Sequence, residues 1–209
     1  MLLHRILVKK AIQKRFKFQK TQFQGSAALV KITGINFDSL LYRKKIFIDE
    51  IALDSVNSYF FKDKTKPIDT KHFPEYPAQL ITSIKTPILI KHVLATNVNL
   101  TYNEIKPDKN RGKANINKAT FKIENITTVD TSQPLMMKTD AFLENKAHFI
   151  LNIDFDYKKP EFSFRGTFSK FDLNDLNPLI QSFTPASINK GVADKIEFTG
   201  VAKEKKADG

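Results

Sequence analysis

Residues 86–105, TPILIKHVLATNVNLTYNEI, alternate apolar and polar residues as a β-strand does, but the alternation slips by one position halfway along. Ile88 and Ile90 share one parity, and the next apolar residue of the series is Val93. One extra residue that shifts the side-chain phase is typical of a β-bulge, which bends a strand while its apolar residues stay on one face. The stretch therefore predicts a bent strand.

The same slip recurs in two other segments. Residues 46–60 match residues 88–102 at an offset of 42 positions, and both contain I-x-I-x-x-[IV]. Val30, Ile32 and Ile35 form a third copy. Three bends at the same place in the pattern predict a sheet that curves along its whole length, although chance spacing in an Ile-rich β protein is an alternative.

The other apolar residues also indicate a mainly β fold. The chain has 18 Phe, 5 Tyr and no Trp, and these residues occur in short alternating runs. Residues 87–126 contain two runs around a loop at 106–112, which predicts a hairpin, and residues 135–171 predict a meander. SLLYRK (residues 39–44) is expected to be a short connector. We therefore expect an elongated, curved antiparallel sheet, a β-groove or half-barrel of repeated bent strands, with one or two short helices.

The remaining segments set the expected domain organisation. Residues 1–24 form a basic N-terminal segment, either a strand or an amphipathic helix, and residues 25–209 form a single β-rich domain. Prolines mark residues 62–86 as a Pro-rich loop within that domain. Helical spacing predicts a short helix at residues 172–183, with Asp172 as its N-cap.

The net charge of +12 is concentrated near the N-terminus. Eight basic residues precede the first acidic residue, Asp38, so the rest of the chain has a net charge of only +4 (12 − 8). A basic end of this kind suits a solvated edge, an anionic membrane surface or nucleic acid, and nucleic acid is the least favoured of the three. The candidate residues for an anionic surface are Arg5, Lys9, Lys10, Lys14 and Arg15.

No residue pattern points to catalysis, a metal or a cofactor. The chain lacks cysteine, and no Gly-rich phosphate loop or nucleophile elbow occurs. Asp154 and Asp156 share a face of an expected strand, where a solvated outer face explains them better than acid–base chemistry. The histidines are far apart and lack the spacing of metal motifs; they are His4, His72, His92 and His148. We therefore expect a non-enzymatic protein without a metal site.

A row of large apolar residues is the positive functional signal. The row alternates along one expected strand and continues across a turn at residues 158–160 into the next. In a closed domain this row is core, whereas in an open curved sheet it forms a groove wall suited to acyl chains, because burying each methylene contributes about 0.8 kcal/mol. The candidate groove residues are Phe149, Leu151, Ile153, Phe155, Phe162, Phe164 and Phe168.

A long succession of segments carries a family resemblance. It begins with KIFIDEIALDSVNSYFFKDK and FPEYPAQL, continues with TPILIKHVLATNVNLTYNEI, FKIENIT and MMKTDAFL, and ends with FRGTFSKFDLNDLNPLI and INKGVADKIEFTG. Tyr102 and Glu104 supply the Y-x-E of its central part. From about residue 45 to residue 209, the chain resembles the C-terminal region of AsmA-like proteins, in an uncharacterised branch of large envelope proteins of Gram-negative bacteria.

The resemblance implies an elongated β-rich structure with an apolar groove, held in the periplasm by an inner-membrane anchor. It also implies a role in outer-membrane biogenesis or in phospholipid transport between the two membranes. The sequence has no run of the ~18 apolar residues that a spanning helix needs, so we expect this chain to be a fragment of a longer parent.

Three functional hypotheses follow. The first is a non-enzymatic envelope protein whose apolar groove binds phospholipid or another acyl lipid. The second is a structural or partner-binding β scaffold with no lipid ligand. The third is a protein that binds an anionic polymer through residues 5–20.

Overall fold

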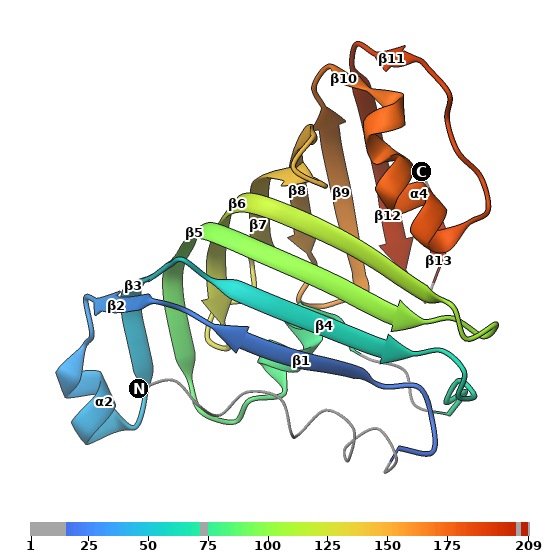
Figure 1. Cartoon of the computed structure of the whole chain (residues 1–209). Coiled ribbons are helices and arrows are strands. Elements are labelled where there is room, and N and C mark those ends of the chain that lie inside the picture. The colour runs from blue at the N-terminus through green and yellow to red at the C-terminus, as the bar shows by residue number, and fades with distance from the viewer. Residues whose placement is uncertain (1–15, 72–74, 204–205, 209) are drawn as a thin grey trace, which may run out of the picture.

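The protein folds into a large, open and strongly bent β-sheet with short helices at its margins (Figure 1). The computed structural model describes residues 16–71, 75–203 and 206–208. The main sheet contains β1 (Thr21–Ser26), β2 (Leu29–Thr33), β3 (Ile46–Asp54), β4 (Asn57–Asp63), β5 (Ile88–Ile105), β6 (Arg111–Thr127), β7 (Leu135–Leu143), β8 (Ala147–Phe155), β9 (Glu161–Phe168), β12 (Ile196–Lys203) and β13 (Lys206–Asp208). A separate two-stranded sheet pairs β10 (Phe171–Asp172) with β11 (Val192–Ala193).

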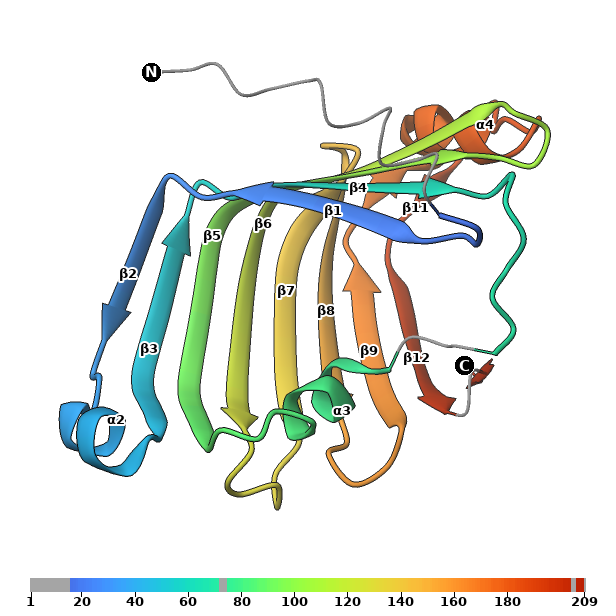
Figure 2. The ribbon, with the colours of Figure 1, turned by 90° about the horizontal axis from the view of Figure 1, so that it is seen from below.

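The main sheet has two wings that share the long strands β5 and β6 (Figure 2). The long wing contains β2, β3, the first half of β5, the second half of β6, and then β7, β8, β9, β12 and β13. The short wing contains β1, β4 and the remaining halves of β5 and β6. Figure 2 shows the short wing edge-on above the strands of the long wing, so the two wings enclose an angle.

The predicted fold class is confirmed in its main features. The structure is mainly β, the sheet is elongated, curved and not closed, and the helices are few and short. The sheet is mixed and not wholly antiparallel, because β3 and β4 both pair with β5 in parallel orientation. The hairpin of β5 and β6 and the meander of β7, β8 and β9 lie where the sequence predicted them.

The wings meet at a corner where three adjacent strand segments have a left-handed backbone. Ser55, Asn97 and Lys118 have φ angles of 52, 51 and 52 degrees. The β5–β6 register also shifts there, between Ala95 and Leu100. Such irregularities insert a bend and a change of side-chain phase, so the apolar residues stay inside the angle on both wings.

The carboxylate of Asp54 ties the strands together at this corner. Its Oδ1 accepts hydrogen bonds from Thr96 Oγ1 and Asn97 Nδ2, each at 2.7 Å, and its Oδ2 accepts one from Ser55 Oγ at 2.8 Å. These hydrogen bonds, that of Thr96 first, lower the pKa of Asp54. The corner is therefore fastened by side chains as well as by the backbone ladder.

The prediction of a β-bulge between Ile90 and Val93 is wrong. The register of β5 with β6 shifts further along the strand, between Ala95 and Leu100. The register is the same on both sides of residues 91–92, pairing Ile90 with Ile126 and Val93 with Ile123, so β5 carries no extra residue there. Both strands change phase together, at a point where Asn125 has a φ of 63 degrees. The sequence of one strand cannot distinguish a shared phase change from a bulge, because both produce the same slip.

The offset of 42 residues is the register of a parallel strand pair. β3 pairs with β5 so that Ile46 lies beside Ile88, and β4 continues at the same offset along the rest of β5. The third copy lies in β2 on the other side of β3, with Ile32 opposite Ile51. The three similar patterns are therefore neighbours in space, where each strand must direct its apolar residues to the same face.

Within the described ranges, four short helical segments accompany the sheet: α2 (Phe37–Arg43), α3 (Pro77–Thr82), the 3-10 helix η1 (Leu173–Leu176) and α4 (Asn177–Phe183). The prediction of a connector at SLLYRK is wrong, because Asn36 Oδ1 accepts a 2.8 Å hydrogen bond from Ser39 N and caps α2. Asp172 occupies the N-cap position of η1 but makes no capping hydrogen bond with its side chain.

The segments assigned to the N-terminal region and the Pro-rich loop contain regular structure. Residues 21–24 lie in β1, which pairs with β4. β4 extends to Asp63, and α3 occupies part of the Pro-rich loop at 62–86. This loop is the crossover that the parallel pairing of β4 and β5 requires.

Candidate functional site

The seven candidate groove residues lie together on one face of β8 and β9. Cross-strand pairing sets Phe149 beside Phe168, Ile153 beside Phe164, and Phe155 beside Phe162, while Leu151 faces Gly166. We call this face of the long wing the inner face, because Val56, Leu100 and Ile116 near the corner pack into the same cluster as Phe149 and Phe168.

The phenylalanine rings form a continuous row along the inner face. Ring centroids are 5.4 Å apart for Phe149 and Phe168, 5.2 Å for Phe155 and Phe162, and 6.1 Å for Phe162 and Phe164. Phe198 of β12 extends the row, at 6.3 Å from Phe164 and 6.0 Å from Phe168. Offset and edge contacts of this kind are favourable for aromatic rings.

Sequence reasoning missed Phe198. Its ring lies over Gly166, where a Cβ atom would collide with it, so the glycine provides the space that the ring occupies. The signal was present in the sequence, since Ile196, Phe198 and Gly200 share a parity in the expected last strand. What was missing was the pairing of that strand with β9.

The inner face is apolar across the long wing, from β2 to β12. Among the described residues that register and packing place on this face, Thr139 is the polar exception and none is charged. Strands lie about 4.8 Å apart, so the face extends roughly 30 Å across the strands. Its residues are Val30, Ile32, Ile48, Ile51, Leu53, Ile90, Val93, Ala95, Phe121, Ile123, Ile126, Leu135, Met137, Thr139, Ala141, Leu143, Ala147, Phe149, Leu151, Ile153, Phe155, Phe162, Phe164, Gly166, Phe168, Ile196, Phe198, Gly200 and Ala202.

The outer face of the same strands carries the charged side chains, with Phe142 and Ile150 among its apolar residues. Lys138, Asn152 and Arg165 lie side by side on β7, β8 and β9, and Asp140 and Asp154 flank them. The inner face is therefore the more apolar of the two, and the charged residues lie on the outer face, as in antiparallel sheets with one solvated face.

The inner face is partly covered. Phe149 and Phe155 are buried, whereas Leu151, Phe162 and Phe164 keep part of their surface exposed. Ile153 and Phe168 are likewise half-buried. The row is therefore neither a sealed core nor a fully exposed surface.

Helix α3 provides part of this cover. Tyr76 contacts Phe162 edge to face with ring centroids 5.3 Å apart, and Ala78 packs among Leu135, Phe155 and Tyr157. Gln79 Nε2 donates hydrogen bonds to the carbonyl oxygens of Asp156 at 2.9 Å and Lys159 at 2.8 Å, which fixes the helix to the β8–β9 turn.

Thr139 is an unpaired hydroxyl in the middle of the inner face. Its side chain lies opposite Leu151 on β8 and Phe121 on β6, and the residue is 2% exposed. Its Oγ1 has no hydrogen-bond partner among the described residues. A buried hydroxyl without a partner costs about 1–3 kcal/mol, so this position is a local weakness of the apolar face.

An ion pair between a buried carboxylate and a partly exposed lysine lies at the far end of the short wing. Glu104 is 3% exposed, and its Oε2 is 2.7 Å from both Lys64 Nζ and Tyr102 Oη, which donates a hydrogen bond to it. Burial raises the pKa of Glu104, but the hydrogen bonds from Lys64 and Tyr102 lower it more, so the pKa is below its usual value. Burial and the neighbouring carboxylate raise the pKa of Tyr102.

Helix α4 covers this ion pair. The ring of Phe183 lies against Gly112 of β6, where a Cβ atom would be 2.6 Å from the ring and 3.0 Å from Glu104 Cγ. The Y-x-E segment is therefore a structural feature in which the glycine permits the close approach of α4.

The other sequence-predicted residues do not assemble into a site. Arg5, Lys9, Lys10, Lys14 and Arg15, and also His4 and His72, lie outside the described residues. His92 lies 3.8 Å from Glu124 across the strand pair, and His148 contacts Asp140 and Ser169 at 2.9 Å on the outer face.

The two aspartates considered for acid–base chemistry have separate roles. Asp154 is exposed on β8, whereas Asp156 accepts hydrogen bonds from the backbone of Lys158 and Lys159 and shapes the turn. Within the described ranges, no group of three or more ligand-type side chains is positioned to hold a metal ion.

Two further findings bear on identity. Among the helices of the described segments, none combines the length and the apolar character required to cross a bilayer. No family model, curated protein or solved structure matches the chain.

Proposed function

We propose that this chain is a non-enzymatic cell-envelope protein of the AsmA-like type whose inner face binds the acyl chains of phospholipids. The observation that carries the proposal is the uncharged inner face of the long wing, half-exposed over several strands and lined by a row of phenylalanines. The proposal includes a periplasmic location and a role in outer-membrane biogenesis or phospholipid transport.

The physical argument is the match between the face and an acyl chain. An acyl chain needs no specific polar partner and gains about 0.8 kcal/mol for each methylene that it buries. An inner face without charged side chains imposes no desolvation cost on such a ligand, whereas a charge on this face would. The opposite face, which carries the charged side chains, gives the protein a surface compatible with water.

Phe164→Asp is the sharpest test of this proposal. Phe164 is half-buried in the middle of the row, so a carboxylate there is expected to exclude an acyl chain while the sheet survives. We expect native mass spectrometry to detect phospholipid adducts on the parent protein and to show loss of most of these adducts in the variant.

Asn152→Asp is the matched control. This position is on the outer face of β8, between Lys138 and Arg165, so the new carboxylate is near two cations. The control variant should keep the lipid adducts of the parent. Absence of adducts from the parent protein, or equal loss in both variants, would contradict the proposal.

A structural scaffold is the second candidate, because Phe149 and Phe155 are buried and α3 packs on Phe155. In that case the whole row is core. Phe164→Asp would then abolish the cooperative thermal transition, measured by circular dichroism, and the parent protein would carry no lipid. The two candidates therefore differ in both measurements.

A further inference from the structure

The end of the long wing that is farthest from the short wing consists of connecting loops. We call it the loop end; it comprises residues 34–45 with α2, 83–87, 128–134 and 156–160. Figure 2 shows these segments along the lower margin of the long wing, where they reach a similar level. One flat surface could therefore contact several of them at once.

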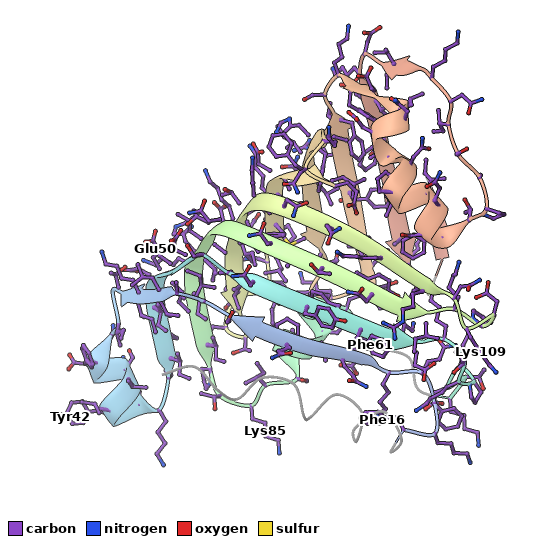
Figure 3. The ribbon with its side chains drawn as sticks, viewed as in Figure 1. Phe16, Tyr42, Glu50, Phe61, Lys85 and Lys109 are labelled. Atoms are coloured by element: carbon purple, nitrogen blue, oxygen red, sulfur yellow. The ribbon has the colours of Figure 1, made fainter. Side chains whose placement is uncertain are left out.

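Helix α2 presents its apolar side chains to solvent. Ser39 is its buried residue, whereas Phe37, Leu41 and Tyr42 are 61%, 68% and 80% exposed. A surface helix of a soluble domain normally turns its apolar stripe toward the core and its polar side chains outward. In α2 every residue except Ser39 is exposed, so the helix leaves its apolar side chains unburied, and Figure 3 shows Tyr42 projecting from the margin of the molecule.

Other loops add apolar residues and cations at the same end. Ile84 and Val129 are exposed there. Arg43 and Lys44 follow directly on the apolar residues of α2, and Asp38 is the acidic residue of its first turn. The further exposed cations of the loop end are Lys85, Lys158 and Lys159. With Lys45 the loop end has six cations, and its acidic residues are Asp38, Asp130 and Asp156, so cations are in excess.

We propose that the loop end docks on an anionic bilayer surface, with α2 entering the headgroup region. Apolar side chains enter the boundary between headgroups and acyl chains, Tyr suits the interface because its ring is amphipathic, and the neighbouring cations attract anionic headgroups. Exposed aromatic and aliphatic residues also suit a protein interface, and the excess of cations beside them is what favours an anionic bilayer. The proposal does not depend on lipid binding by the inner face.

A single tryptophan reports directly on this docking, because the chain has no tryptophan of its own. With vesicles of phosphatidylcholine and phosphatidylglycerol in equal parts, the emission of Tyr42→Trp should shift to the blue and be quenched by brominated phosphatidylcholine. Phe23→Trp, an exposed position on β1 in the short wing, should show neither effect. Vesicles of phosphatidylcholine alone should give a weaker response, since they lack anionic headgroups.

A charge variant tests the same surface by co-sedimentation. Leu41→Asp should lower the partition of the protein into the mixed vesicles by at least about tenfold, because an inserted leucine is replaced by a hydrated charge. Val192→Asp, at an exposed apolar position on β11, should leave partition unchanged. Circular dichroism verifies that both variants are folded.

The outcomes separate docking at the loop end from docking elsewhere. Co-sedimentation of the Tyr42→Trp variant with its indole emission unchanged from that in water would overturn the proposal, because another surface, such as the basic N-terminal segment, would then make the contact. Failure of the parent protein to co-sediment, or equal partition of Leu41→Asp and the parent, would also overturn it.

Discussion

Glu104 is a buried, charged residue of β5, and Phe183 of α4 packs beside it. The carboxylate is ionised under Phe183 because Lys64 and Tyr102 both bind its Oε2. Removing the charge of Glu104 weakens its hydrogen bonds to the partly exposed Lys64 and to Tyr102, and hydrogen bonds to charged groups contribute about 1.5–3 kcal/mol. The position therefore offers a test of how α4 is held against the short wing.

Glu104→Gln should lower the free energy of unfolding at neutral pH by roughly 1–3 kcal/mol. The folded pKa of Glu104 is below the unfolded value near 4.5, so its contribution is present above that pH and is lost as the pH falls through the folded pKa. Urea denaturation should show the difference between parent and variant narrowing below about pH 4.5.

Asp194→Asn is the control for this measurement. The Asp194–Lys170 pair is exposed, at 3.1 Å, and exposed pairs contribute about 0–1 kcal/mol. A difference between Glu104→Gln and the parent that stays constant from pH 7 to acid would show that ionisation of Glu104 does not stabilise the fold.

At the scale of elements, the corner depends on a few residues with unusual backbone conformations. Lys118 has a φ of 52 degrees and is exposed, whereas Lys122 is an exposed residue in the regular part of the same strand. A left-handed conformation costs a residue with a Cβ about 1–2 kcal/mol, and glycine avoids that cost. The two lysines should therefore respond in opposite ways to the same substitution.

Lys118→Gly should leave the free energy of unfolding unchanged or raise it by up to about 1 kcal/mol, while Lys122→Gly should lower it by about 1 kcal/mol. Lys118→Val should be destabilising, because a β-branched residue is strained at positive φ. Thermal or urea denaturation measures all three. A stabilising Lys118→Val would show that β6 does not adopt this bend in solution.

The strands and the bend show which features of the fold could be predicted from the sequence alone. Alternation predicted the strands and placed Phe149, Phe155 and Phe164 on one face, because parity along a strand is a local property. The location of the bend could not be predicted, since the slip at Ile90 and the corner at Asn97 shift the side-chain phase alike and only the partner strand distinguishes them.

Features that depend on the pairing of distant segments could not be predicted from the sequence. The resemblance between residues 46–60 and 88–102 was visible, but its origin in a parallel pair became apparent only from the register. Phe198 joins the row because β12 pairs with β9, and Glu104 is buried because α4 packs there. In each case the missing information was which element lies beside which.

At the scale of the whole molecule, the bent sheet has an apolar inner face, a more polar outer face that carries the charged side chains, and a loop end with exposed apolar residues and an excess of cations. This arrangement would place the lower end of the inner face near a bilayer when the loop end is docked (Figure 2). The lipid-binding proposal concerns the inner face and the docking proposal concerns α2, so either can fail without the other.

The most direct test of the central proposal is photo-crosslinking with a phospholipid that carries a diazirine in its acyl chain. After irradiation and digestion, mass spectrometry should locate the crosslinks in residues 149–168 and 196–202, on inner-face side chains such as Phe164 and Phe198. Phe164→Asp should abolish these crosslinks and Asn152→Asp should retain them. Crosslinks confined to outer-face residues, or none on the parent protein, would contradict the account.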